Sequence, residues 1–262
     1  MPGMGGVNKN RNFILNCEGW KNLTLGPYDG ADAVVRLAPM TGAVENVGYP
    51  DEHDFYAELV SFCIESGIPV TLGDGVPDEK LLWGIEAVKK HAGLKAGVFF
   101  KPYPDEKITE RFLWAQNIAE FCGIDIDSYN IVTMRNLVHL EKKSAEQLLK
   151  LKKLFAEKNI PFALKGIFSD EDIELVKKIH PDIAVVSNHG GRVDVREGST
   201  AEFLLESYKE LLSNCGELWV DGGIRCASDV LKAASYGVKS VLVGRPFASA
   251  LCLKKSFESI IK

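Results

Sequence analysis

The chain has 262 residues, of which 46% are hydrophobic and 26% charged, and its 31 basic and 36 acidic side chains give a net charge of −5. This balance excludes global disorder, and it provides no basic field for nucleic acid. Because the sequence holds no run of ~18 apolar residues and its N-terminus lacks the apolar segment of a signal peptide, we expect neither a membrane partner nor secretion.

The cysteines indicate the compartment. Six of them are widely spaced, without a CxxC pair, at positions 17, 63, 122, 215, 226 and 252. In a chain of this length, such spacing is typical of reduced thiols. We therefore expect a cytoplasmic protein with neither disulfides nor a bound metal.

Short apolar segments rich in Val, Ile and Phe alternate with longer amphipathic segments. The first kind predicts strands buried on both faces. Taken in chain order, they cover residues 34–38, 69–72, 96–100, 123–126, 161–164, 183–187, 218–220 and 240–243. Between them, apolar residues recur at helical spacing, as in Leu148, Leu151 and Leu154, and we assign these stripes to helices packed on a core.

Eight strand–helix pairs in ~250 residues predict a single-domain α/β protein, a (β/α)₈ TIM barrel over residues 34–262. A doubly wound open sheet is the alternative, but its glycine fingerprint usually follows the first strand, whereas the glycines here cluster late. Residues 1–33 are rich in Gly and Asn. We expect them to form an irregular segment that covers the base of the barrel.

Polar and glycine-rich segments directly follow the predicted strands. They cover residues 38–42, 73–75, 101–103, 125–127, 165–166, 187–192, 221–225 and 244–246. A purely structural sheet would not need these groups, and glycine lets backbone N–H groups approach a ligand closely. Since the carboxyl ends of barrel strands carry the chemistry, we place the candidate site there.

The last two of these segments read DGGIR (221–225) and GRP (244–246). Barrels commonly bind phosphate after their seventh and eighth strands, through backbone N–H groups and a helix N-terminus. Arg225 and Arg245 would add charge-assisted hydrogen bonds. The alternative is that the glycines form turns and the arginines are surface charges.

The segment SNHGGR (187–192) contains the strongest candidate for a base. His189 stands at a strand end between small residues, three positions before Arg192, which suits a general base beside an anion clamp. Asp127, at the end of the fourth predicted strand, is the carboxylate we expect to orient it. Lys165 stands at the end of an apolar strand. Three roles are open to it: a nucleophile, a positive charge that stabilises a developing anion, or a member of a structural ion pair.

Together these motifs resemble those of the FMN-dependent α-hydroxy-acid dehydrogenase and oxidase family. From residue 163 onward the chain reads ALKGI, VSNHGGR, VDGGIRCASDVLKAASYG and VLVGRP in the family's order and at its intervals. Upstream, APMTG, FKPY and IDID match the family's flavin and substrate segments more weakly. The resemblance covers residues 34–250 and implies bound FMN.

The resemblance also implies a set of cofactor contacts: Ala38, Pro39, Met40, Lys101, Lys165, Ser187, Asp221, Gly223, Arg225, Gly244 and Arg245. Within this set, Lys165 would lie near N1 and O2 of the flavin and stabilise the reduced anionic ring. Asp221 would bind the ribityl chain, and the glycines and arginines of the last two segments would hold the phosphate.

The resemblance implies catalytic roles for five residues. His189 would take the hydroxyl or α-proton of the substrate, Asp127 would stabilise the imidazolium, and Lys165 would support the flavin. Arg192 would bind the substrate carboxylate in a bidentate manner. Tyr103 would form a hydrogen bond to the substrate.

The chain departs from the family pattern in several places. Lys101 stands where the family has a flavin-binding glutamine, and Asp125 where it has threonine. Tyr28 lies in the region of the family's N-terminal active-site tyrosine but outside any motif. Arg135 is a weak match for a second carboxylate-binding arginine.

From this resemblance we expect an enzyme that oxidises a small L-2-hydroxy acid to a 2-oxo acid. His189 would act as the base, and hydride equivalents would pass to flavin N5. The alternatives are another reaction on an FMN barrel, such as a different dehydrogenation or a flavin-dependent isomerisation, or an FMN-binding barrel without turnover. A homo-oligomer is compatible with all three.

Overall fold

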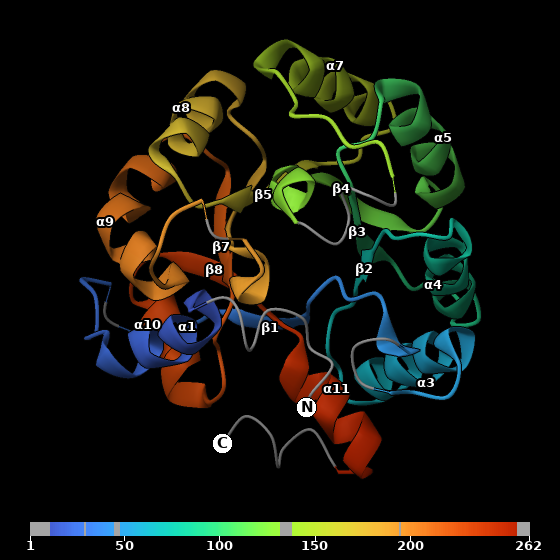
Figure 1. Ribbon diagram of the computed structural model, residues 1–262, viewed down its shortest axis with the longest axis horizontal. Coiled ribbons are helices and arrows are strands. Elements are labelled where there is room, and N and C mark those ends of the chain that lie inside the picture. The colour runs from blue at the N-terminus through green and yellow to red at the C-terminus, as the bar shows by residue number, and fades with distance from the viewer. Residues whose placement is uncertain (1–10, 29, 45–47, 132–137, 194, 256–262) are drawn as a thin grey trace.

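Strands and helices alternate around a ring in a computed structural model that describes residues 11–28, 30–44, 48–131, 138–193 and 195–255 (Figure 1). The strands are β1 (Val34–Leu37), β2 (Thr71–Gly73), β3 (Ala96–Phe100), β4 (Ala119–Asp125), β5 (Phe162–Ile167), β6 (Ile183–Val186), β7 (Glu217–Asp221) and β8 (Val238–Val243). All eight predicted strands are present, and the expected (β/α)₈ barrel is confirmed.

The sheet is parallel throughout, in the order β1-β8-β7-β6-β5-β4-β3-β2. This order excludes a doubly wound sheet, in which the first strand would lie inside the sheet. Its two end strands meet where a single bridge joins Met40 to Leu72, and where the Leu37 N–H donates to the Pro69 carbonyl at 2.9 Å. The ring of strands is therefore nearly closed, with a thin seam between β1 and β2.

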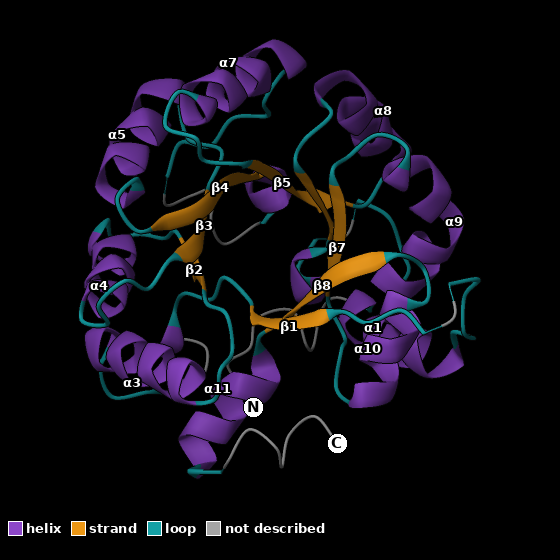
Figure 2. Ribbon diagram, turned by 180° about the vertical axis from the view of Figure 1, so that it is seen from behind, coloured by secondary structure: helices purple, strands orange, loops and turns teal. Residues whose placement is uncertain are grey.

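The helices surround the strands (Figure 2). They are α3 (Glu52–Glu65), α4 (Glu79–Lys89), α5 (Asp105–Ala115), α7 (Ala145–Ala156), α8 (Asp170–Ile179), α9 (Thr200–Leu212), α10 (Ala227–Ala234) and α11 (Arg245–Leu253). Each turns its apolar stripe inward, as in α7, where Leu148, Leu151 and Phe155 are buried. A capping box between Ser144 and Gln147 starts this helix.

The interior of the barrel is filled by side chains. Its apolar cluster consists of Phe99, Phe121, Ala163, Ile183, Val185, Trp219 and Leu242, with Ala38 packed against it. Near the amino ends of the strands, Arg36 forms a bidentate ion pair with Glu120 at 2.7 and 2.8 Å, beside the rings of Phe121 and Trp219. Because side chains occupy the barrel below, the polar groups at the carboxyl ends are placed to meet a ligand.

The expectation for the N-terminal segment is wrong for residues 12–22. They form helix α1 (Asn12–Asn22), which lies beside α10 and contacts the short helix η2 (His189–Gly191) that follows β6. It therefore reaches the carboxyl ends of the strands rather than the base. The chain then runs toward the base, where the Tyr28 N–H donates to the Ser235 carbonyl at 3.0 Å.

Among the helices of the described residues, none is long and apolar enough to cross a membrane.

Candidate active site

A buried ion pair joins β4 and β5 at the mouth of the barrel. The parallel register places Asp125 directly opposite Lys165. The Lys165 Nζ lies 2.9 Å from Asp125 Oδ1 and 3.5 Å from Asp221 Oδ2, and its side chain is 2% exposed. Burial alone would lower the pKa of Lys165, but the carboxylates of Asp125 and Asp221 outweigh it and raise that pKa above its usual value. The lysine is therefore a fixed positive charge, and not a neutral nucleophile.

His189 is presented by a turn that glycine makes possible. After β6, His189, Gly190 and Gly191 have φ angles of 56°, 64° and 89°, in the left-handed region. The Asn188 side chain accepts from the Gly191 N–H at 2.9 Å, and the His189 N–H donates to Ser187 Oγ at 3.2 Å. The SNHGGR motif thus folds into a tight turn that points the imidazole into the mouth of the barrel.

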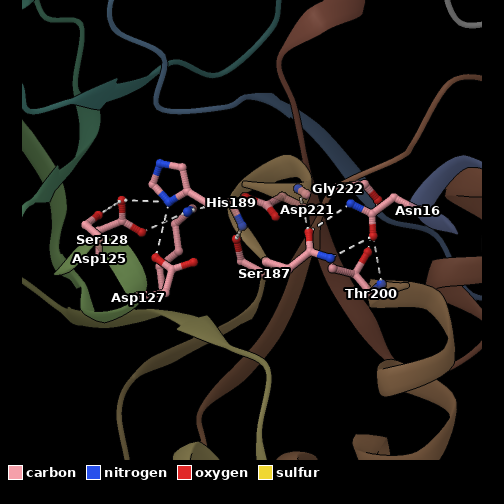
Figure 3. Close-up of polar contacts among 12 residues, drawn as sticks. Asn16, Asp125, Asp127, Ser128, Ser187, His189, Thr200, Asp221 and Gly222 are labelled. Atoms are coloured by element: carbon pink, nitrogen blue, oxygen red, sulfur yellow. Dashed lines mark hydrogen bonds and ion pairs between the residues drawn. The ribbon is translucent and has the colours of Figure 1, made fainter. Parts of the chain in front are cut away.

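The imidazole faces two carboxylates with one nitrogen. His189 Nδ1 lies 3.2 Å from Asp127 Oδ1 and 3.5 Å from Asp125 Oδ2. The other ring nitrogen points away from both carboxylates (Figure 3). Burial lowers the pKa of His189 to about 3, although Asp125 acts in the opposite direction. A proton on Nδ1, held by the carboxylates, leaves Nε2 as the free acceptor of a base.

Asp127 is the carboxylate predicted to orient His189, and the structure brings the two together. It lies in the short helix η1 (Ile126–Asn130), which follows β4 and packs on β5. A Cβ at Gly166, where φ is 101°, would lie 2.7 Å from Asp127 Cγ, so the glycine of ALKGI makes room for this carboxylate. Asp127 Oδ2 is buried and has no hydrogen-bond partner among the described residues. Burial, followed by the charge of Asp125, raises the pKa of Asp127 well above its usual value.

Three guanidinium groups gather beside this cluster. The Arg245 Nη2 donates to the Gly190 carbonyl at 3.0 Å, and its guanidinium lies 4.1 Å from the centre of the Phe13 ring of α1. Burial, then the positive charges of Arg192 and Arg225, lower the pKa of Arg245 to about 9. Like charges held this close in a protein interior favour an anion between them.

The glycines of this region permit close contacts. Gly222 and Gly223 have φ angles of 84° and 86°, and a Cβ at Gly223 would lie 2.4 Å from the Asn16 carbonyl oxygen of α1. A Cβ at Gly244 would lie 2.9 Å from Met40 Sδ. Arg245 begins α11, so the free N–H groups of this helix add partial positive charge beside the arginines.

The segment after β1 lines the opposite side of the same mouth. The Ala38 N–H donates to the Val243 carbonyl at 2.9 Å, and the Met40 carbonyl accepts from the Tyr56 hydroxyl at 3.2 Å. The carbonyl carbon and oxygen of Pro39 would lie 3.1 and 3.3 Å from a Cβ built at Gly73. These contacts fix the backbone of residues 38–40 between β8 and β2.

Tyr103 lies in a different cluster from the base. It is 1% exposed, its hydroxyl donates to the Gly75 carbonyl at 3.4 Å, and the guanidinium of Arg111 lies 4.5 Å from its ring centre. Asp74 accepts from Arg111 Nε at 2.9 Å in the same cluster. Lys101 links the two regions, since its N–H donates to Asp74 at 3.4 Å while its charge lowers the pKa of His189.

One of the two residues compared with the family pattern lies away from the site. Tyr28 packs near Gly237, just before β8 begins, which is the base of the barrel and not its mouth. Arg135 lies outside the described residues.

Our sequence prediction omitted three side chains that the structure places in or against the site. Asp125 contacts both Lys165 and His189. Asn16 and Asn188 exchange two amide hydrogen bonds, at 2.8 and 3.0 Å, between α1 and the turn of His189. The IDID sequence signalled Asp125, because it stands at the same strand end, two residues before Asp127. Asn16 carries no motif.

Comparison with known proteins identifies a family and several relatives. Residues 89–256 match the family described as FMN-dependent dehydrogenase. The chain is 41% identical over 95 residues to 2-hydroxyacid oxidase 2 of Bos taurus, and 43% identical over 96 residues to 4-hydroxymandelate oxidase of Amycolatopsis orientalis. These alignments cover 36% and 37% of this chain and 27% of each relative. The matched segment therefore spans about a quarter of the length of these curated relatives.

Solved structures resemble the whole barrel. A mandelate oxidase structure matches 95% of this chain and 80% of its own with a TM-score of 0.66 at 21% identity. A mandelate oxidase variant with a C4a-OH-FMN adduct matches with a TM-score of 0.68 at 21% identity. At this identity the likeness concerns the fold. Because the family match spans well over half of the chain and includes every motif from ALKGI to GRP, the chain belongs to the FMN-dependent dehydrogenase family.

Proposed function

We propose that this protein binds FMN and oxidises a small L-2-hydroxy acid to the corresponding 2-oxo acid. The observation that carries the proposal is the orientation of His189, whose Nδ1 faces buried carboxylates while Nε2 is left free, beside a buried lysine and a group of arginines. The relatives named above as 2-hydroxyacid and 4-hydroxymandelate oxidases support the same class of substrate.

The residues at the mouth fit FMN. The positive charges of Arg192 and Arg225 both act on Arg245, and such a group of arginines suits a terminal phosphate or a substrate carboxylate. Within the part of the chain that the structure describes, buried Asp221 Oδ1 has no hydrogen-bond partner, which suits a hydroxyl donor of a ribityl chain. Lys165 supplies a buried positive charge for the electron-rich edge of the ring. When bound, FMN supplies the acceptor for the two electrons that leave the substrate.

In this proposal Arg192 binds the substrate carboxylate and so orients the C2 position toward His189. His189 Nε2 takes one proton from that position, from either the hydroxyl or the carbon. Asp127, at 3.2 Å, and Asp125, at 3.5 Å, stabilise the resulting imidazolium. Lys165 stabilises negative charge on the cofactor side.

Three other assignments belong to the proposal. The FMN site is completed by seven further residues: Ala38, Pro39, Met40, Lys101, Ser187, Gly223 and Gly244. Tyr103 binds the substrate, which requires its hydroxyl to leave the Gly75 carbonyl. We place the protein in the cytoplasm, because six unpaired thiols suit a reducing compartment.

Reconstitution with FMN followed by anaerobic mixing with a panel of 2-hydroxy acids tests the function. We expect a yellow protein whose visible band bleaches with at least one L-2-hydroxy acid, and the released cofactor to be FMN and not FAD. A protein that holds FMN but bleaches with no hydroxy acid would favour the isomerase or binding-only alternatives. A protein that takes up no FMN would contradict all three.

A further inference from the structure

Asp125 is the side chain that contacts both the buried lysine and the base. Its Oδ1 accepts from Lys165 Nζ at 2.9 Å. Its Oδ2 accepts from Ser128 Oγ at 2.8 Å and lies 3.5 Å from His189 Nδ1. Both oxygens are thus fixed, and the residue is 6% exposed.

Charged groups face Asp125 from every strand end around it. Lys101 follows β3, Lys165 lies on β5 and His189 follows β6, while the carboxylates of Asp127 and Asp221 come from η1 and β7. Burial alone would raise the pKa of Asp125, but Lys165, then His189 and Lys101, lower it far below its usual range. The group is therefore a permanent negative charge between the lysine and the imidazole.

We infer that Asp125 is a positioning residue that couples the base to the flavin site, by neutralising Lys165 on one side and supporting positive charge on His189 on the other. This inference rests on the proposed function. The two effects oppose each other in catalysis. The first reduces the negative charge that the bound flavin can carry, and the second favours proton transfer to His189.

Removing this carboxylate has two consequences of opposite sign. Lys165 loses its closest counterion, so negative charge on the flavin becomes more favourable. Protonated His189 keeps only Asp127 among the two carboxylates that face its Nδ1, so proton transfer becomes less favourable. Loss of a residue with a purely structural role would instead weaken both the capacity of the flavin for negative charge and proton transfer to His189.

The test compares FMN-loaded wild type with Asp125→Asn, which keeps the shape, and with Asp125→Thr, which is smaller. Sulfite titration of the visible band and dye-equilibrated reduction measure how readily the flavin carries negative charge. Stopped-flow bleaching with a hydroxy acid measures proton transfer. The matched control is Glu146→Gln, which removes one negative charge from an exposed position of α7.

In both Asp125 variants we expect sulfite to bind about tenfold more tightly or better, the flavin potential to rise, and bleaching to slow about tenfold. Glu146→Gln should leave all three unchanged. In a Lys165→Met background, Asp125→Asn should no longer change sulfite affinity, because the effect acts through Lys165.

Unchanged or weaker sulfite binding in FMN-loaded variants would overturn the inference, and so would loss of FMN by both variants, since that would mark a structural role. If sulfite responds as expected but no hydroxy acid bleaches wild type, the coupling to Lys165 stands and the proposed oxidation fails. Wild type that binds no FMN would overturn both.

Discussion

His189 acquires its chemistry from the groups around it and not from its intrinsic pKa. Burial keeps the ring neutral, and the carboxylates on Nδ1 hold the proton there, so that Nε2 is the acceptor. Lys165 is likewise fixed as a cation by Asp125 and Asp221. In the proposed oxidation, the neutral base would take a proton from the substrate, and the fixed positive charge would stabilise negative charge on the cofactor side.

Replacing His189 by Gln should leave FMN binding and the fold intact while slowing flavin bleaching by ~10²–10⁴-fold, because the base is lost and the arginines are not. Asp127→Asn should slow bleaching less, since the base remains and one of its two carboxylates is lost. Stopped-flow bleaching under anaerobic conditions measures both. Wild-type rates in His189→Gln would contradict the proposed mechanism.

The lowered pKa of His189 predicts an unusual pH dependence. Only the neutral imidazole accepts a proton, and a pKa of about 3 keeps it neutral well below the usual range. Protonation of His189 should therefore not lower the bleaching rate at low substrate concentration between about pH 8 and about pH 5, where an ordinary histidine would already be mostly protonated. A rate that halves near pH 6.5 would show that His189 titrates normally.

At the scale of single elements, α1 is the part that apolar periodicity missed. Its buried residues are Asn12, Asn16, Gly19 and Trp20, which follow helical spacing but are mostly polar or small. Gly19 lies so close to α9 that a Cβ there would sit 2.1 Å from Ser199 Oγ. A search for apolar stripes cannot find such a face, because hydrogen bonds and close packing hold it, as with Asn16 and Asn188.

Asn16→Ala should destabilise the protein and loosen the turn of His189. The change leaves the Asn188 amide and the Thr200 N–H, which donates to Asn16 Oδ1 at 3.0 Å, without their partner. The expected loss is about 1–3 kcal/mol in the free energy of unfolding, measured by urea denaturation. Asn22→Ala, at the exposed end of the same helix, is the control and should change stability by less than about 0.5 kcal/mol.

At the scale of the whole molecule, the barrel and most of its site could be predicted because alternating apolar segments and strand-end motifs determine them locally. The predicted start of β4, residue 123, was four residues late, since β4 begins at Ala119. Glu120 interrupts the apolar residues at the start of that strand, and it pairs with Arg36 of β1. Long-range pairs of this kind, and those of α1, are invisible until the chain is folded.

Ligand binding should stabilise the molecule selectively. FMN at about a hundred times its Kd should add about 2.7 kcal/mol to the free energy of unfolding, whereas riboflavin, which lacks the phosphate, should add much less. Thermal unfolding with each ligand measures this. Arg245→Met should abolish the difference, and Arg11→Met, which removes an exposed arginine, should preserve it. Equal stabilisation by FMN and riboflavin would mean that the arginines do not hold the phosphate.

The thin seam between β1 and β2 also determines where the barrel opens in local fluctuations. Every other neighbouring pair of strands is joined by a ladder, but here one bridge and one nearby backbone bond hold the ring together in the described chain. Amide protons of β1 and β2 should therefore exchange with solvent earlier than those of β5 to β7, by opening of the seam alone. Residues 38–40 follow β1 at this seam. A flavin bound against them would therefore slow that exchange and stabilise the closed ring of strands.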